Sequence, residues 1–197
     1  TESKDAIMPD APQLYEHIEK NVLIDTQFGD EVLTEKAFAS AVHIFEHEFH
    51  IQRVTGVTME PRSALGSYDV DTGKFTLVAG SGGAVRQQSE IAAVLRIDAS
   101  DIRVISPDVG GNFGTRNRVY IEFGLVLFAA KKINRPVKFT ATRTESFLTD
   151  YQGRDLVTHI ALALDADGKF LGLKCDNISN VGAHCVSLSP LGKGSGL

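Results

Sequence analysis

Asp108-Val109-Gly110-Gly111-Asn112-Phe113-Gly114 is the stretch that decides the fold, and it stands between a predicted strand at 102–105 and a predicted helix at 118–133. Glycine lets the backbone adopt positive φ and approach a ligand closely. A helix that begins just after such a loop offers unpaired N–H groups to an anion. The pattern therefore predicts either a ligand-binding loop or a tight strand-to-helix turn that binds nothing.

A second glycine cluster, Gly80-Ser81-Gly82-Gly83, lies in the same kind of place, between a predicted strand at 74–79 and a predicted helix that ends near Arg96. Neither cluster is a Walker A loop, because no Gly-Lys-Ser or Gly-Lys-Thr follows. The first cluster does not satisfy the dinucleotide fingerprint G-x-G-x-x-G, and the second matches it only weakly, since Val85 stands where that pattern needs glycine or alanine. Two such loops in one domain can converge on one extended anionic ligand.

The rest of the chain alternates irregularly between helical and strand patterns. Apolar residues recur at helical spacing in 28–41, and period-two alternation predicts a long strand at 40–54. Further strands are predicted at 63–70 and 137–142, and a hairpin at 156–164 and 170–178. Asn134-Arg135-Pro136 should end the long helix, because proline cannot continue one. These elements predict an α+β fold with a mixed β-sheet and packed helices.

Composition excludes several classes of function. The 197 residues are 43% hydrophobic and 23% charged, as in an ordinary globular protein. A net charge of -5 argues against a nucleic-acid partner, which would need a basic surface. The longest apolar run, Phe123 to Ala130, is too short to span a membrane. With no apolar segment near Thr1 that would suit a signal peptide, the expected location is the cytoplasm.

The ends of the sequence suggest a piece of a longer chain. Residues 1–27 are expected to be a linker from a preceding domain, 28–186 the domain itself, and 187–197 a truncated tail. Such a piece should expose apolar surface that packs elsewhere in the whole protein. A homodimer is one alternative way to cover that surface.

Two sets of potential ligands favour a structural interpretation. His43, His47 and His50 would share a face on a helix, but a strand puts His50 on the opposite face from the other two. Exposed or strand-packing histidines are therefore favoured over a zinc site. Cys175 and Cys185 are predicted to be buried thiols rather than a disulfide.

Charged neighbours in the sequence receive a similar interpretation. Glu60 and Arg62 are predicted to form a surface rather than a buried ion pair. Arg143-Thr144-Glu145 and Arg154-Asp155 are predicted to be charged loop neighbours. Asp165-Ala166-Asp167-Gly168 is predicted to be a hairpin turn, because it lacks the glutamate of a calcium loop.

The order of the motifs resembles that in the first molybdopterin-binding domain of the xanthine oxidase, aldehyde oxidase and aerobic carbon monoxide dehydrogenase large subunits. The resemblance covers roughly Val42 to His184. The motifs that carry it are Met59-Glu60-Pro61-Arg62, Gly80-Ser81-Gly82-Gly83, Gly110-Gly111-Asn112-Phe113-Gly114, Asn134-Arg135-Pro136-Val137-Lys138, Arg143-Thr144-Glu145 and Asn180-Val181-Gly182-Ala183.

The resemblance implies roles for particular residues. Phe113 would place its backbone N–H against a molybdenum centre, with Gly111 and Gly114 allowing the close approach. The residues implied to bind the cofactor are Ser81, Gly82, Gly83, Gly110, Gly111, Asn112, Phe113 and Gly114, and Asn117 is implied to contact substrate.

This sequence departs from the family pattern at four places. Asn112 stands where the family often has glycine, and Arg116 stands where it often has lysine. Ser81 and Gly82 replace the Thr-Gln pair of xanthine oxidases, so a glutamine donor is missing. Asn117 replaces a glutamate of the xanthine-specific members.

The resemblance also implies a reaction and partners. The reaction would be hydroxylation of an aldehyde or N-heterocycle, or oxidation of carbon monoxide, with molybdopterin as cofactor. Partners would be the remainder of the large subunit, iron–sulfur and FAD subunits or domains, and a small-molecule substrate. In the family the general base lies later in the subunit, so we assign no catalytic residue, and we expect the isolated chain to be inactive and to hold no cofactor. The alternative is a stand-alone α+β module that binds a small anion or a protein partner without catalysis.

Overall fold

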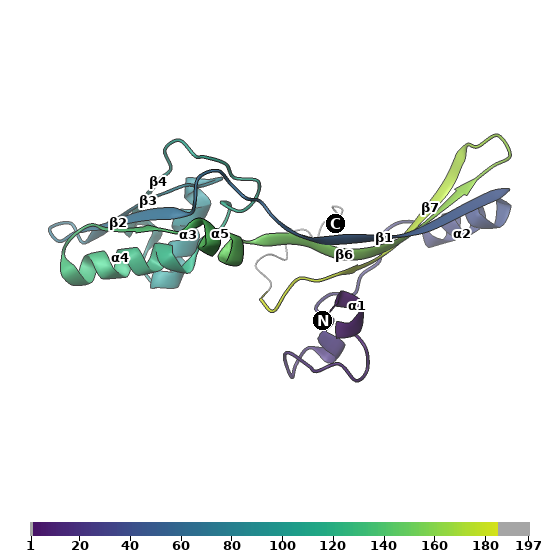
Figure 1. The fold of residues 1–197 in the computed structure, drawn as a ribbon, viewed down its shortest axis with the longest axis horizontal. Helices are drawn as coiled ribbons and strands as arrows, with labels where there is room; N and C mark the ends of the chain where they lie inside the picture. The colour runs from purple at the N-terminus through teal and green to yellow at the C-terminus, as the bar shows by residue number, and fades with distance from the viewer. Residues whose placement is uncertain (1, 185–197) are drawn as a thin grey trace. The chain divides into compact units, whose positions relative to one another are not determined.

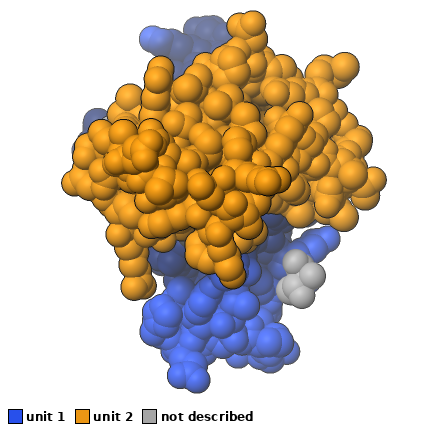
Figure 2. Space-filling view, turned by 90° about the vertical axis from the view of Figure 1, so that its left-hand side faces the viewer, with its two compact units in different colours: residues 1–54, 154–197 blue, residues 55–153 orange. Residues whose placement is uncertain are grey.

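A computed structural model describes residues 2–184. The chain divides into two compact units: residues 55–153 form one, and residues 1–54 with 154–197 form the other (Figure 2). We call them the inserted unit and the outer unit, because the first is one continuous segment between the two parts of the second. The predicted tail at 187–197 and Cys185 lie outside the described residues.

The inserted unit is built on a four-stranded sheet in the order β4-β3-β2-β5 (Figure 1). The strands are β2 (Ser63–Asp69), β3 (Lys74–Ala79), β4 (Ile102–Ile105) and β5 (Val137–Thr140). β2 pairs antiparallel with both β3 and β5, whereas β3 and β4 are parallel. The predicted α+β fold with a mixed sheet is therefore confirmed.

Helices α3 (Ala84–Leu95) and α4 (Ile121–Ile133) cover one face of this sheet (Figure 1). The core between them consists of alternate residues of the strands and the inner faces of the helices, including Phe75, Leu77, Ile91, Phe123 and Leu127. α4 lies close against β2 because Gly66 has no side chain. A Cβ at Gly66 would lie 2.7 Å from the backbone carbon of Val126.

α4 begins at Ile121 rather than at Arg118, where the sequence pattern predicted its start. Tyr120 has extended backbone, and its hydroxyl donates to the carbonyl of Thr115 at 2.6 Å. This bond holds residues 115–120 in a turn, so the helix begins about one turn later than predicted. The helix ends as predicted, with Asn134 in the left-handed conformation at φ +50° before Pro136.

The outer unit has a three-stranded sheet in the order β1-β6-β7 (Figure 1). Its strands are β1 (His43–Thr55), β6 (Gln152–Leu164) and β7 (Phe170–Ser179). β6 and β7 form the predicted antiparallel hairpin, and Gly168 takes φ +80° in its turn. α2 (Glu31–Ser40) packs on β7, where Gly172 faces Ala37. Two short segments precede α2: α1 (Ser3–Ala6) and the 3-10 turn η1 (Glu19–Asn21).

β1 confirms the predicted period-two strand, and it lies at one edge of its sheet. The side chains of Phe45 and Phe49 are exposed at 64% and 46%. The ring of His47 meets that of Phe49 at 4.5 Å, whereas His50 contacts Glu48 on the other face. Within residues 2–184, no helix is long and apolar enough to cross a membrane.

Candidate functional site

The loop Gly110–Gly114 folds back on itself through three residues with positive φ. These are Gly111 at +113°, Phe113 at +49° and Gly114 at +92°. Positive φ is unfavourable for a residue with a Cβ, so Phe113 is held there by its surroundings. Its ring is 76% exposed, so burial of the side chain does not explain the conformation.

Asn112 supplies the bonds that hold this loop. Its Oδ1 accepts from the backbone N–H of Gly114 at 3.0 Å and of Arg116 at 3.2 Å. Its carbonyl accepts from the N–H of Thr115 at 2.9 Å. Asn112 thus bonds to the backbone of the three residues that follow Phe113, and these bonds hold Phe113 between them and Asn112. Among the described residues, the N–H groups of Gly111, Asn112 and Phe113 have no hydrogen-bond partner.

The second glycine loop meets the first directly. The N–H of Gly82 donates to the carbonyl of Arg116 at 3.1 Å. Behind it, the fully buried Gln87 donates from Nε2 to the carbonyl of Gly80 at 3.2 Å, and the hydroxyl of Ser81 accepts from the N–H of Gly83 at 2.8 Å. These contacts bring the two loops together, and their convergence on one anionic ligand stays a prediction.

Asn117 lies on the same junction. Its Oδ1 accepts from Nδ2 of Asn112 at 2.9 Å, and both side chains lie over Gly82. A Cβ at Gly82 would be 1.9 Å from Oδ1 of Asn117 and 2.3 Å from Nδ2 of Asn112. A side chain at position 82 would therefore have to displace both asparagine side chains.

Glu60 joins the first loop from a third segment. Its Oε2 accepts from the N–H of Gly110 at 2.8 Å, and its own N–H donates to the carbonyl of Gly110 at 3.1 Å. The prediction of a surface ion pair between Glu60 and Arg62 is therefore wrong. Arg62 is 1% exposed, and its guanidinium binds Asp150 and Glu122 instead of Glu60.

A buried group of charges lies behind the loop. Asp150 accepts from Arg62 and, at 3.0 Å, from Arg116, and both arginines are almost fully buried. Arg62 also donates to Glu122 at 2.6 Å, and its guanidinium lies 4.2 Å from the centre of the Tyr120 ring. Burial alone would lower the pKa of Arg62, but Glu122 and Asp150 outweigh it and raise that pKa, so the arginine stays charged.

Arg116 links this buried group to the site. It donates to the hydroxyl of Thr58 at 2.8 Å and to the carbonyl of Glu60 at 3.1 Å, while its own carbonyl binds Gly82. Sequence reasoning noted Arg116 only as a departure from a lysine that is common in the family, and it missed Asp150 altogether. Asp150 follows Arg116 by 34 residues and carries no local pattern that marks it as a partner.

Two predictions about charged loop neighbours are corrected. Arg143 begins the helix α5 (Arg143–Thr149), which Thr142 and Glu145 start with a capping box. The Thr-x-x-Glu spacing is a recognisable start signal that sequence reasoning overlooked. Arg143 donates to the carbonyls of Thr58 and Met59 at 2.7 and 2.6 Å and so supports the segment that carries Glu60. Arg154 and Asp155 lie within β6 instead of a loop.

The remaining candidate ligands lie outside this site. Within residues 2–184, no group of three or more histidine, cysteine or acidic side chains is arranged to hold a metal ion. His43, His47 and His50 are exposed along β1. Cys175 is exposed rather than buried, because it lies on the edge strand β7, so that prediction is wrong.

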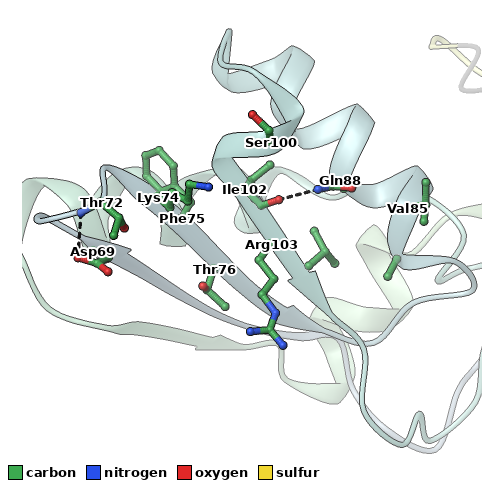
Figure 3. A pocket seen from close by; sticks show the side chains of 12 residues that line it. Asp69, Thr72, Lys74, Phe75, Thr76, Val85, Gln88, Ser100, Ile102 and Arg103 are labelled. Atoms are coloured by element: carbon green, nitrogen blue, oxygen red, sulfur yellow. Dashed lines mark hydrogen bonds between the residues drawn. The ribbon is translucent and has the colours of Figure 1, made fainter.

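A hollow of about 510 Å³ lies at the β4 edge of the inserted unit (Figure 3). Lys74, Phe75 and Arg103 are among the residues that line it. Gln88 also borders it, but its amide donates to the carbonyls of Ile102 at 2.7 Å and Ala99 at 2.9 Å. The amide nitrogen of Gln88 is therefore already used within the protein.

Comparison with known proteins gives one consistent result. A profile described as "Molybdopterin cofactor-binding domain" matches residues 14–194. The chain is 31% identical over 169 residues to the 6-hydroxypseudooxynicotine dehydrogenase complex subunit gamma of Paenarthrobacter nicotinovorans, covering 85% of this chain and 21% of that protein. It is 28% identical over 198 residues to the carbon monoxide dehydrogenase large chain of Hydrogenophaga pseudoflava, covering 94% and 25%.

Solved structures agree with the sequence matches. The structure titled as a reconstituted CO dehydrogenase from Oligotropha carboxidovorans superposes with a TM-score of 0.82 at 27% identity. The match covers 90% of this chain and 24% of that one. The chain thus spans about a fifth to a quarter of the length of these relatives.

Proposed function

The chain belongs to the molybdopterin cofactor-binding domain family, and from that premise we propose that its two glycine loops form part of a molybdopterin site in a molybdenum hydroxylase large subunit. The observation that carries the proposal is the meeting of the loops at Gly82 and Arg116, beside a row of backbone N–H groups that have no acceptor among the described residues. Three successive donors that no group of the described residues occupies are available to a ligand at this place.

The residues present fit such a cofactor. The free N–H groups of Gly111, Asn112 and Phe113 are donors, which suits a ligand that carries phosphate and other acceptor atoms. Gly83 and Gly114 have no atom within 4 Å of an added Cβ, so open space lies beside their backbone. α3, which begins at Ala84, adds the partial positive charge of a helix N-terminus.

Each loop would contribute differently. In the first loop, Gly110–Gly114 would bind through the backbone, with Phe113 presenting its N–H where the left-handed turn aims it. In the second, Gly82 and Gly83 would allow close approach, and the hydroxyl of Ser81 would donate, because its oxygen already accepts from Gly83. When bound, the molybdenum cofactor would supply the redox chemistry of an oxidative hydroxylation.

The substrate and partners are further parts of the proposal. Asn117 is exposed beside the junction, and we assign it to substrate contact; its amide nitrogen has no hydrogen-bond partner among the described residues. The substrate would be an aldehyde, an N-heterocycle or carbon monoxide. The relatives are named as a complex subunit and a large chain, which supports assembly with iron–sulfur and FAD subunits or domains and with the remainder of a large subunit.

The substitution Gly114→Ala tests the proposal in the full-length protein. Alanine at φ +92° is strained by about 1–2 kcal/mol, and relieving that strain would turn the Phe113 N–H away. We expect molybdenum and pterin content per mole of protein to fall roughly tenfold, measured by elemental analysis and by fluorescence of the released pterin.

Gly168→Ala is the matched control. Gly168 has φ +80° in the β6–β7 turn and equally open surroundings, so the strain is similar but remote from the loops. It should leave cofactor content unchanged. Equal cofactor content in the two variants would contradict the role of the loop, and wild-type protein without molybdenum would contradict the function itself.

A further inference from the structure

The amide of Asn112 can take only one orientation. Its oxygen faces two backbone donors, the N–H groups of Gly114 and Arg116. Turning the amide over would point its NH₂ group at both donors and lose both bonds. The nitrogen of Asn112 must therefore face Asn117.

That orientation fixes Asn117 in turn. Because Asn112 presents a donor, Asn117 must present its oxygen, and the two atoms lie 2.9 Å apart. Both side chains rest on Gly82, the residue whose N–H binds the carbonyl of Arg116. One side-chain bond therefore lies directly above the backbone bond that joins the two loops.

We propose that Asn112 and Asn117 form a clamp that closes the segment between them over Gly82 and thereby sets the position of the Phe113 backbone N–H. The inference rests on the proposed cofactor site, because the clamp matters for function only if that N–H meets a ligand. Both asparagines are positioning residues in this role. Asn112 holds the backbone N–H groups that follow Phe113, and Asn117 fixes the side chain of Asn112 above Gly82.

The clamp needs one hydrogen-bond donor between the two side chains, and either residue can supply it. In Asn117→Asp, the new carboxylate still accepts from Asn112. In Asn112→Asp, the carboxylate still accepts from Gly114 and Arg116, and Asn117 can turn its amide over to donate. In the double variant, two acceptor-only carboxylates face each other at close range and repel.

A double-mutant cycle in the full-length protein tests the clamp. Molybdenum and pterin content are measured in wild type, Asn112→Asp, Asn117→Asp and the double variant. We expect each single variant to lower the content, because it adds a negative charge beside a site for a phosphate-bearing ligand, and the double variant to fall roughly tenfold below the product of the single effects. A purely structural role of either residue would give effects that multiply, and that result would overturn the clamp.

Gly82→Ala provides an independent test should the double variant fail to fold, which its unfolding midpoint would reveal. The added methyl group would collide with both asparagine side chains. Because Gly82 itself lies in the proposed cofactor site, this variant is judged by hydrogen exchange at the Arg116 amide, which binds Oδ1 of Asn112. The clamp predicts faster exchange there, and unchanged exchange would overturn it. If wild-type protein holds no molybdenum, the proposed function fails, and the same exchange measurement still tests the clamp.

Discussion

The two units of this chain use the same pairing of arginine with aspartate in opposite settings. In the inserted unit, Asp150 joins Arg62 and Arg116, and all three side chains are 1–2% exposed. In the outer unit, Asp155 pairs with Arg53 at 2.8 Å, but both side chains are about one third exposed. If one partner is removed, water can solvate the remaining charge in the exposed Arg53–Asp155 pair, but it cannot reach the charges that remain in the buried group. The difference shows which unit is built to hold a fixed geometry.

The sheets of the two units also differ in how closely they are packed. In the inserted unit, α4 packs so closely on β2 that Gly66 touches its backbone. In the outer unit, β1 is exposed along nearly all of its 13 residues, including Phe45 and Phe49. A site that depends on a hydrogen bond of 3.1 Å between two loops needs support of the first kind.

The largest expected effect comes from Asp150→Asn. It leaves two buried guanidinium groups facing a neutral amide, and breaking a buried ion pair costs about 3–5 kcal/mol. The matched variant in the outer unit, Asp155→Asn, should cost about 1 kcal/mol or less. Denaturant unfolding of the full chain measures both. Equal losses would erase the contrast between the units.

A smaller contrast is expected for two glycines at packing contacts. Gly66→Ala would place a methyl group 2.7 Å from the backbone of α4, and overpacking of this kind costs about 1–3 kcal/mol. Gly172→Ala would place a methyl group 3.0 Å from the Cβ of Ala37. Because Ala37 lies on α2, an exposed helix that can shift, the loss in unfolding free energy should be under about 1 kcal/mol. Thermal unfolding of both variants measures the two losses in stability. A larger loss for Gly172→Ala than for Gly66→Ala would contradict the prediction.

The smallest effects concern two carboxylates and pH. Burial alone would raise the pKa of Glu90 in the inserted unit, but hydrogen bonds from Arg86 and Arg118 lower it overall. In the outer unit, a hydrogen bond from Lys4, with one from His50, lowers the pKa of the exposed Glu48. A lowered pKa means that each group stabilises the fold above its unfolded pKa and loses that contribution as pH falls through the folded value.

Glu90→Gln should therefore cost on the order of 1 kcal/mol at pH 7, and the difference from wild type should shrink as the pH falls below the ordinary range of a glutamate. Glu48→Gln should change unfolding little at either pH, because water screens that carboxylate. Urea unfolding of both variants at neutral and acidic pH provides the comparison. A Glu90→Gln loss that grows toward acid pH would have the wrong sign.

Local patterns in the sequence were enough to predict most elements. The alternation from Ser40 to Val54 predicted β1, and glycine clusters between strand and helix patterns predicted both loops. The helix α5 was also within reach, since Thr142 and Glu145 have the spacing of a capping box. Each of these signals depends on residues within a few positions of one another.

The support of the site could not be predicted in this way. Arg62 meets Asp150 across 88 residues, and Glu60 meets Gly110 across 50. Charge alone does not show whether an arginine will be buried, because the answer depends on which partner the fold brings to it. The Asn112–Asn117 contact spans only five residues, yet it depends on the αL turn at Phe113 between them.

The insertion of one unit within the other has a consequence for biosynthesis. Residues 55–153 leave the ribosome as an unbroken segment, and every partner in their sheet and buried ion group is then already available. β1 precedes them but must wait for β6, about a hundred residues later, before it can pair. Because domains generally fold as units during synthesis, we expect the loop region to acquire its shape while β1 still lacks its neighbour. The unpaired edges of this long strand are then what a chaperone would need to shield.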